Sequence, residues 1–170
     1  MHGALLYLKN KQFFAKRAGI YRVLGSFSMV RELAERYQLL HIIDLDLNKG
    51  NAANMNVYEE LTYYVHTQVG INARALGFAG ELQALHVRLV VKPELYRSSM
   101  NPDFLAFSVD SEKEKGLIEK LLPKRPIDVV IRDEKLLEAF KQPAFRVFFI
   151  TEKPQVRTVF CLIRPVTGRS

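Results

Sequence analysis

Four aspartates stand at or just after the ends of apolar runs that have the composition of buried strands. Asp44 and Asp46 close LLHIIDL, Asp110 ends FLAFSVD, and Asp133 follows IDVVIR. In parallel α/β folds the chemistry collects at the carboxyl ends of the strands, where neighbouring carboxylates can act as general acid and base. The alternative role is helix capping, which fits Asp133 well and Asp46 in part. We expect Asp44 and Asp110 to be functional and leave both roles open for Asp133.

A second chemical pattern is the segment KNKQFFAKRAGIYR (9–22), which interleaves cations with Phe13, Phe14 and Tyr21. This composition is found on surfaces that stack the bases and pair the phosphates of single-stranded nucleic acid. It is also the composition of a basic β-hairpin whose aromatic side chains face the core. We favour the hairpin and keep the nucleic-acid surface as the alternative.

Sequence motifs for the common cofactors and nucleophiles are missing. The chain has no Walker-type loop, GxGxxG, CxxC, HExxH or GxSxG. Its lone cysteine, Cys161, offers neither an internal disulfide nor a metal cluster. His41 and His66 lie inside apolar runs and are expected to be hydrogen-bonded residues of the core or rim. We therefore expect no metal and no cofactor.

The elements that position these residues alternate along the chain. Eight apolar runs read as strands, namely 4–8, 39–45, 64–70, 87–91, 104–110, 127–132, 146–151 and 159–164. Most are continuous, as expected for strands covered on both faces. Helical patterns cover 28–38, 56–64, 73–85, 111–122 and 133–141. Ser111 and Asp133 are placed to cap the last two.

Alternating strands and helices predict a parallel sheet in a single α/β domain over residues 1–170. Eight strands favour a compact, loop-trimmed (β/α) barrel related to the TIM barrels. Such barrels usually need about 250 residues, so an open parallel α/β sheet is the alternative. Missing helices would leave strand faces uncovered, which favours a homodimer.

Charge is concentrated at the two ends of the chain. The net charge is +7, and neither residues 1–31 nor residues 153–170 contain an acid. This distribution predicts either a solvated surface or a contact with phosphate or nucleic acid. No apolar run approaches the roughly 20 residues that span a bilayer, so we expect a cytoplasmic protein without a membrane partner.

Five segments together resemble the histidine-biosynthesis (β/α)8-barrel family, which includes the phosphoribosylformimino-AICAR ribotide isomerase. HIIDLDLNKG, leading to Asn56, is similar to the family's second-strand motif HxVDLDxAxG. LLYLKNKQFFAKR, QVGINAR, FSVD and VVIRDE are similar to its first, third, fifth and sixth strands. The resemblance implies a barrel that binds a sugar phosphate and carries two catalytic aspartates, on the first and fifth strands.

The departures from the family pattern concern its chemistry. Tyr7 stands where the family has its first catalytic aspartate, and Gly70 alone remains of three glycines that shape a phosphate cradle. We therefore expect a phosphosugar-binding protein in which the family's own reaction is lost, with isomerase- or lyase-type chemistry at Asp110 and Tyr7 if any survives. The resemblance assigns substrate binding to Asp44, Asp46, Asn56, Gln68, Gly70 and Asp133. The alternative is a non-enzymatic basic protein that binds nucleic acid or another partner.

Overall fold

A computed structural model describes residues 3–123, 126–151 and 162–166. The strands are β1 (Gly3–Lys9), β2 (Gln12–Arg17), β3 (Ile20–Gly25), β4 (Leu39–Asp44), β5 (His66–Gly70), β6 (Arg88–Val91), β7 (Leu105–Val109), β8 (Ile127–Ile131), β9 (Phe145–Thr151) and β10 (Leu162–Val166). The helices are α1 (Phe27–Arg36), α2 (Met55–Leu61), α3 (Ala79–Ala84), α4 (Lys115–Leu121) and α5 (Leu137–Phe140). Short 3₁₀ turns lead into α3, α4 and α5.

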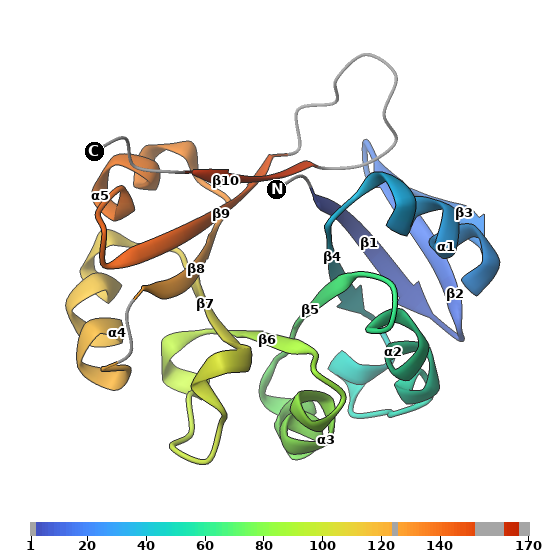
Figure 1. Cartoon of the computed structure of the whole chain (residues 1–170), viewed down its shortest axis with the longest axis horizontal. Coiled ribbons are helices and arrows are strands. Elements are labelled where there is room, and N and C mark those ends of the chain that lie inside the picture. Colours follow the sequence, from blue (N-terminus) through green and yellow to red (C-terminus); the bar gives the residue numbers. More distant parts are fainter. Residues whose placement is uncertain (1–2, 124–125, 152–161, 167–170) are drawn as a thin grey trace.

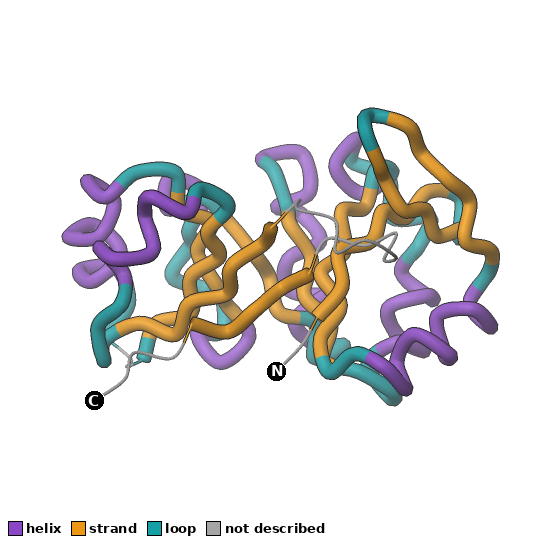
Figure 2. The backbone as a smooth tube through the Cα atoms, turned by 90° about the horizontal axis from the view of Figure 1, so that it is seen from above, coloured by secondary structure: helices purple, strands orange, loops and turns teal. Residues whose placement is uncertain are grey.

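All ten strands belong to one sheet, in the order β10-β9-β8-β7-β6-β5-β4-β1-β2-β3. The seven strands from β9 to β1 in this order pair in parallel, each with its neighbour. Figure 1 shows them as an arc with the helices on its outer side. The view in Figure 2, turned by 90°, shows the strands as a continuous band between flanking helices.

The predicted (β/α) barrel is wrong, because the parallel part of the sheet stays open. In the described residues β9 is not paired with β1; β10 lies between them and runs antiparallel to both. Its pairing with β1 covers two residue pairs, Gly3 with Ile163 and Ala4 with Leu162. The described residues hold five α-helices, of four to ten residues, where a (β/α)8 barrel has eight. A mostly parallel α/β sheet with antiparallel strands at its ends describes the fold.

The segment from Lys9 to Gly25 folds as the predicted basic hairpin. β2 pairs antiparallel with both β1 and β3. Asn10 and Lys11 connect β1 to β2 with φ of 48° and 61°, the left-handed conformation that two-residue hairpin turns require. Phe13 is fully buried, whereas Tyr21 is exposed. One aromatic side chain of the hairpin therefore faces the core and another faces solvent.

The sheet buries apolar side chains on both faces. The larger cluster lies between the strands and the helices and includes Leu6, Ile42 and Phe107 from strands with Tyr58 and Leu82 from helices. The smaller cluster lies on the inner face, with Leu5, Val90, Ala106, Val130, Phe148 and Ile150 among its members. Successive side chains of a strand point to opposite faces. The parity of a residue within its strand therefore decides which cluster it joins.

The helix starts follow the predicted caps. The Ser111 hydroxyl accepts from the amide of Lys113, and Glu114 bonds back to the amide of Ser111 in a capping box. The Asp133 carboxylate accepts from the amide of Lys135. Among the described residues, no helix is both long and apolar enough to cross a membrane.

Candidate functional site

A cavity of about 290 Å³ opens at the carboxyl end of the parallel strands. It is lined by side chains from β4, β6, β7 and β8 and by the loops that follow β4, β5, β6 and β8. Ligand sites of α/β proteins form at this edge of the sheet. The cavity is therefore the candidate site, and its polar groups decide what it can hold.

The mouth of the cavity carries two cations. Lys92 follows β6 and Arg132 follows β8, and both line the cavity and reach solvent. Lys92 Nζ lies 2.7 Å from Asp110 Oδ2, and this hydrogen bond raises the pKa of Lys92. Arg132 makes no ion pair with any residue that the structure describes. Lys92 is thus paired with Asp110 and lies in the field of Glu94 and Glu114, whereas Arg132 has no such carboxylate partner among the described residues.

The inner wall of the cavity is apolar except for two uncharged groups. Val90 and Val130 are buried, and Ser108 from β7 adds a hydroxyl. His41 from β4 is only 2% exposed, and its Nδ1 lies 2.9 Å from Nε2 of Gln68. Burial, helped by the positive charge of Arg132, lowers the pKa of His41 to about 3. The imidazole is therefore neutral at physiological pH, a hydrogen-bonded histidine as the sequence indicated.

The loops after β4 and β5 are tied to each other beside the cavity. Asn48 Nδ2 donates to the carbonyl oxygen of Gly70 at 3.2 Å, and Asn48 Oδ1 accepts from the amide of Asn72 at 3.1 Å. Asn72 Nδ2 returns a bond to the carbonyl oxygen of Asn48 at 2.8 Å. These bonds hold Gly70 at the cavity wall. Because glycine has no side chain, the space above His41 stays open.

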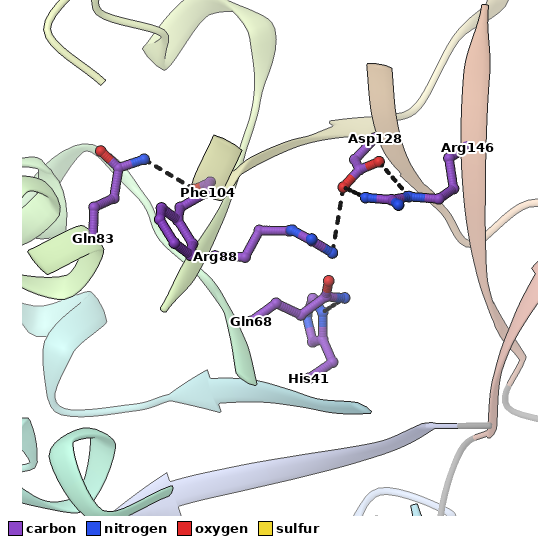
Figure 3. Close-up of polar contacts among 7 residues, drawn as sticks. All are labelled: His41, Gln68, Gln83, Arg88, Phe104, Asp128 and Arg146. Atoms are coloured by element: carbon purple, nitrogen blue, oxygen red, sulfur yellow. Dashed lines mark hydrogen bonds and ion pairs between the residues drawn. The ribbon is translucent and has the colours of Figure 1, made fainter. Parts of the chain in front are cut away.

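Toward the amino ends of the strands, the inner face holds a charged trio. Arg146 donates to both oxygens of Asp128 at 2.7 Å, and Arg88 NH1 lies 3.3 Å from Asp128 Oδ2. Asp128 is 6% exposed, and burial lowers the pKa of Arg88. In Figure 3, Arg88 lies between the Asp128–Arg146 pair above it and the His41–Gln68 pair below it. The inner face is thus polar from the trio up to the floor of the cavity.

Asp44 and Asp46 lie in a separate network on the helix side of the sheet. Asp44 accepts four bonds of 2.9 Å, from the amides of Asp46 and Leu47, from Asn54 Nδ2 and from the Tyr58 hydroxyl. Burial raises the pKa of Asp44, although these donors oppose the rise. Neither aspartate lines the cavity. Both oxygens of Asp44 are engaged by the protein itself.

The same network fastens the β1–β2 turn. Asp46 Oδ2 accepts from the amide of Asn10 at 2.7 Å and from Asn54 Nδ2 at 3.0 Å. Asn54 Oδ1 accepts from the amide of Lys11 at 2.8 Å. The DLD motif that resembles a family signature therefore joins three segments of this chain.

The remaining predicted site residues are spread over the same edge. Gly70 lines the cavity, Gln68 lies behind His41, and Asp110 reaches the mouth through Lys92. Asn56 is an exposed residue of α2, and Asp133 is exposed at its cap. Tyr7 packs edge-on against Tyr21 with ring centroids 5.1 Å apart. Three strands separate β1, which carries Tyr7, from β7, which precedes Asp110, so the structure does not bring the predicted catalytic pair together in the cavity.

Sequence reasoning missed three polar groups that line the cavity, Lys92, Ser108 and Arg132. The signal was available in the alternation of the strands. Ser108 and Arg132 have the same parity as Ala106 and Val130 of the inner cluster. Among the described residues, no three His, Cys, Asp or Glu side chains gather into a metal site.

The Asp44 network yields a stability prediction. Replacing Tyr58 by Phe removes one donor from a buried carboxylate and should lower the free energy of unfolding by about 1.5–3 kcal/mol. Tyr63 is 83% exposed, so Tyr63→Phe, the matched control, should change it by less than about 0.5 kcal/mol. Urea unfolding followed by circular dichroism measures both. Equal effects of the two variants would contradict the structural role of Asp44.

The charged trio yields a second prediction. Asp128→Asn leaves two arginines facing each other on the inner face. It should lower the free energy of unfolding by about 3 kcal/mol. Asp110→Asn, the same change in an exposed pair, should lower the free energy of unfolding by less than about 1 kcal/mol. Thermal and urea unfolding of the two variants provide the comparison. A loss for Asp128→Asn no larger than that for Asp110→Asn would show that the trio does not stabilise the inner face.

Comparison with protein-family models and with curated proteins provides no relative from which a role for this cavity could be transferred. No protein-family model matches the chain, and no curated protein matches it. The likeness to the histidine-biosynthesis barrels therefore rests on the sequence motifs alone, and the function has to be argued from the cavity.

Proposed function

We propose that this protein binds a small phosphorylated metabolite of the sugar-phosphate class in the cavity at the carboxyl edge of β4 to β8. The observation that carries the proposal is the pair of cations, Lys92 and Arg132, at the mouth of a pocket with an apolar, uncharged interior. A phosphate at the mouth would meet both cations, and a neutral body would fit the interior. The volume of about 290 Å³ suits a compound of a few carbon atoms.

Binding is better supported than catalysis. An isomerase of the kind that the sequence resembles needs an acid and a base on opposite sides of its substrate. In this chain Asp110 is 59% exposed and paired with Lys92, and Tyr7 contacts Tyr21 of the hairpin. Lys92, Arg132 and Ser108 all line the cavity, which supports the binding of a phosphate ester. Isomerase activity accordingly stays outside the proposal.

The proposal is tested by measuring phosphate-ester affinity in variants that should weaken binding and in one that should strengthen it. Lys92→Met and Arg132→Met should each weaken binding of glycerol 3-phosphate about tenfold, because each removes a charged donor. Asp110→Asn should strengthen it, because it removes a competing anion from Lys92. Lys141→Met serves as the control, because Lys141 pairs with Glu138 outside the cavity. Isothermal titration calorimetry measures all four, and affinities that do not depend on Lys92 and Arg132 would refute the site.

A second candidate function is the binding of single-stranded nucleic acid by the β1–β2–β3 hairpin. The hairpin exposes Ile20, Tyr21 and Val23 beside the cations Lys16 and Arg22, and β10, from the second basic end of the chain, pairs with β1. Lys16 Nζ lies 5.1 Å from the centre of the Tyr21 ring. Because that ammonium already covers a ring that would have to stack on a base, this function ranks second.

Salt-dependent RNA binding tests the second candidate. The triple variant Lys9→Gln, Lys16→Gln and Arg22→Gln should weaken binding and flatten its salt dependence. A control with the same charge change is Lys113→Gln, Lys135→Gln and Lys141→Gln, three exposed positions beyond the hairpin. Fluorescence anisotropy with a single-stranded oligonucleotide at about 50 mM salt, where phosphate contacts are strong, is the measurement. No binding under these conditions, or equal loss in both triple variants, would remove the hairpin from consideration.

A further inference from the structure

The two ring nitrogens of His41 have different surroundings. Nδ1 faces Nε2 of Gln68 at 2.9 Å, inside the sheet. Nε2 faces the cavity, because a Cβ atom placed on Gly70 would lie 3.7 Å from it and Gly70 lines the cavity. The nitrogen that carries the proton therefore decides whether the floor of the cavity offers a donor or an acceptor.

The orientation of the Gln68 amide follows from Arg88, its neighbour on the side away from His41. His41, Gln68 and Arg88 are register partners across β4, β5 and β6, so their side chains share the inner face. Gln68 Oε1 and Arg88 Nε are buried without a hydrogen-bond partner among the described residues. A guanidinium offers donors only. The amide therefore places its oxygen toward Arg88, as Figure 3 shows, and its NH₂ toward His41.

An NH₂ group that faces Nδ1 can only donate to it. Nδ1 must then be unprotonated, and the single proton of the neutral ring lies on Nε2. The low pKa of His41, caused by burial and by the charge of Arg132, keeps the ring from taking a second proton. Asp128, the carboxylate that pairs with Arg88, is bonded by Arg146 as well and makes no hydrogen bond to the ring.

We propose that Gln68, oriented by Arg88, fixes His41 in the Nε2–H tautomer, so that His41 is a permanent neutral donor to the ligand at the floor of the cavity. The ligand half of this inference rests on the proposed function and narrows it. With the phosphate at Lys92 and Arg132, the donor selects a compound that has a carbonyl or hydroxyl oxygen at its inner end. A carboxylate there would be disfavoured, since the surrounding wall is apolar and offers one neutral N–H.

Nitrogen-15 NMR of histidine-labelled protein tests the tautomer without any ligand. Long-range proton–nitrogen spectra should show Nδ1 of His41 at the unprotonated position and Nε2 at the protonated position, unchanged between pH 8 and pH 5. Gln68→Glu should reverse the pattern, because a carboxylate only accepts and would draw the proton to Nδ1. Gln142→Glu, the same change at an exposed position, should leave it unchanged. A wild-type ring protonated at Nδ1, or one that titrates in this range, would overturn the inference.

Two probes then test the role toward the ligand. Inorganic phosphate and glycerol 3-phosphate should both bind in a Lys92-dependent manner, but only glycerol 3-phosphate should shift the Nε2–H resonance of His41. His41→Phe should weaken the binding of glycerol 3-phosphate about tenfold and leave the affinity for inorganic phosphate unchanged. Binding of both probes with an unmoved His41 resonance would refute the donor role. If neither probe binds, the proposed function fails instead, and the tautomer result still decides whether Gln68 fixes the ring.

Discussion

Buried polar groups must find partners, and this requirement organises both faces of the sheet. The parallel strands are covered on each side, by helices on the outer face and by the opposing wall of the arc on the inner face. On the outer face the buried carboxylate of Asp44 collects four donors, and the network around it joins the β1–β2 turn to the loop after β4. On the inner face Asp128 is held by two arginines. Each network fixes segments that apolar packing alone would leave free to slide.

The cavity is a consequence of where the inner network ends. Asp128 and Arg146 are the second residues of β8 and β9, and Arg88, the first residue of β6, lies in register with the His41–Gln68 pair. Beyond His41 the inner face carries Val90, Val130 and Ser108, and the rim carries Lys92 and Arg132. The pocket thus changes from apolar and neutral inside to cationic outside. This gradient matches the proposed ligand, which has a charged group at one end and a hydrogen-bonding, uncharged body.

The order of strands and helices was predictable because continuous apolar runs and cap residues are local signals. The five helical patterns and the caps at Ser111 and Asp133 were located correctly. That the parallel part of the sheet stays open was not predictable, since it depends on the antiparallel strand β10 and on long-range pairing that no local pattern reports. Within the site, the sequence pattern placed all strand-end aspartates together at one edge, but the structure divides them between the two faces of the sheet. Asp44 has the parity of Leu40 and Ile42, which belong to the outer cluster, whereas Asp110 has the parity of Ala106 on the inner face.

The departures from the resembled family are consistent with a different way of holding a phosphate. Where the family uses glycine-rich backbone cradles, this chain keeps Gly70 and offers two long cationic side chains at the mouth. Backbone amides hold an anion at a fixed position, whereas the attraction of the exposed side chains Lys92 and Arg132 for a phosphate would fall as salt rises. Position must then come from elsewhere in the pocket. In the proposed binding mode, a neutral donor with a fixed tautomer at the floor would supply it, because its hydrogen bond is directional and insensitive to salt. In that proposal, the directional donor at the floor and the cations at the rim have complementary roles, the first positioning the ligand and the second attracting it.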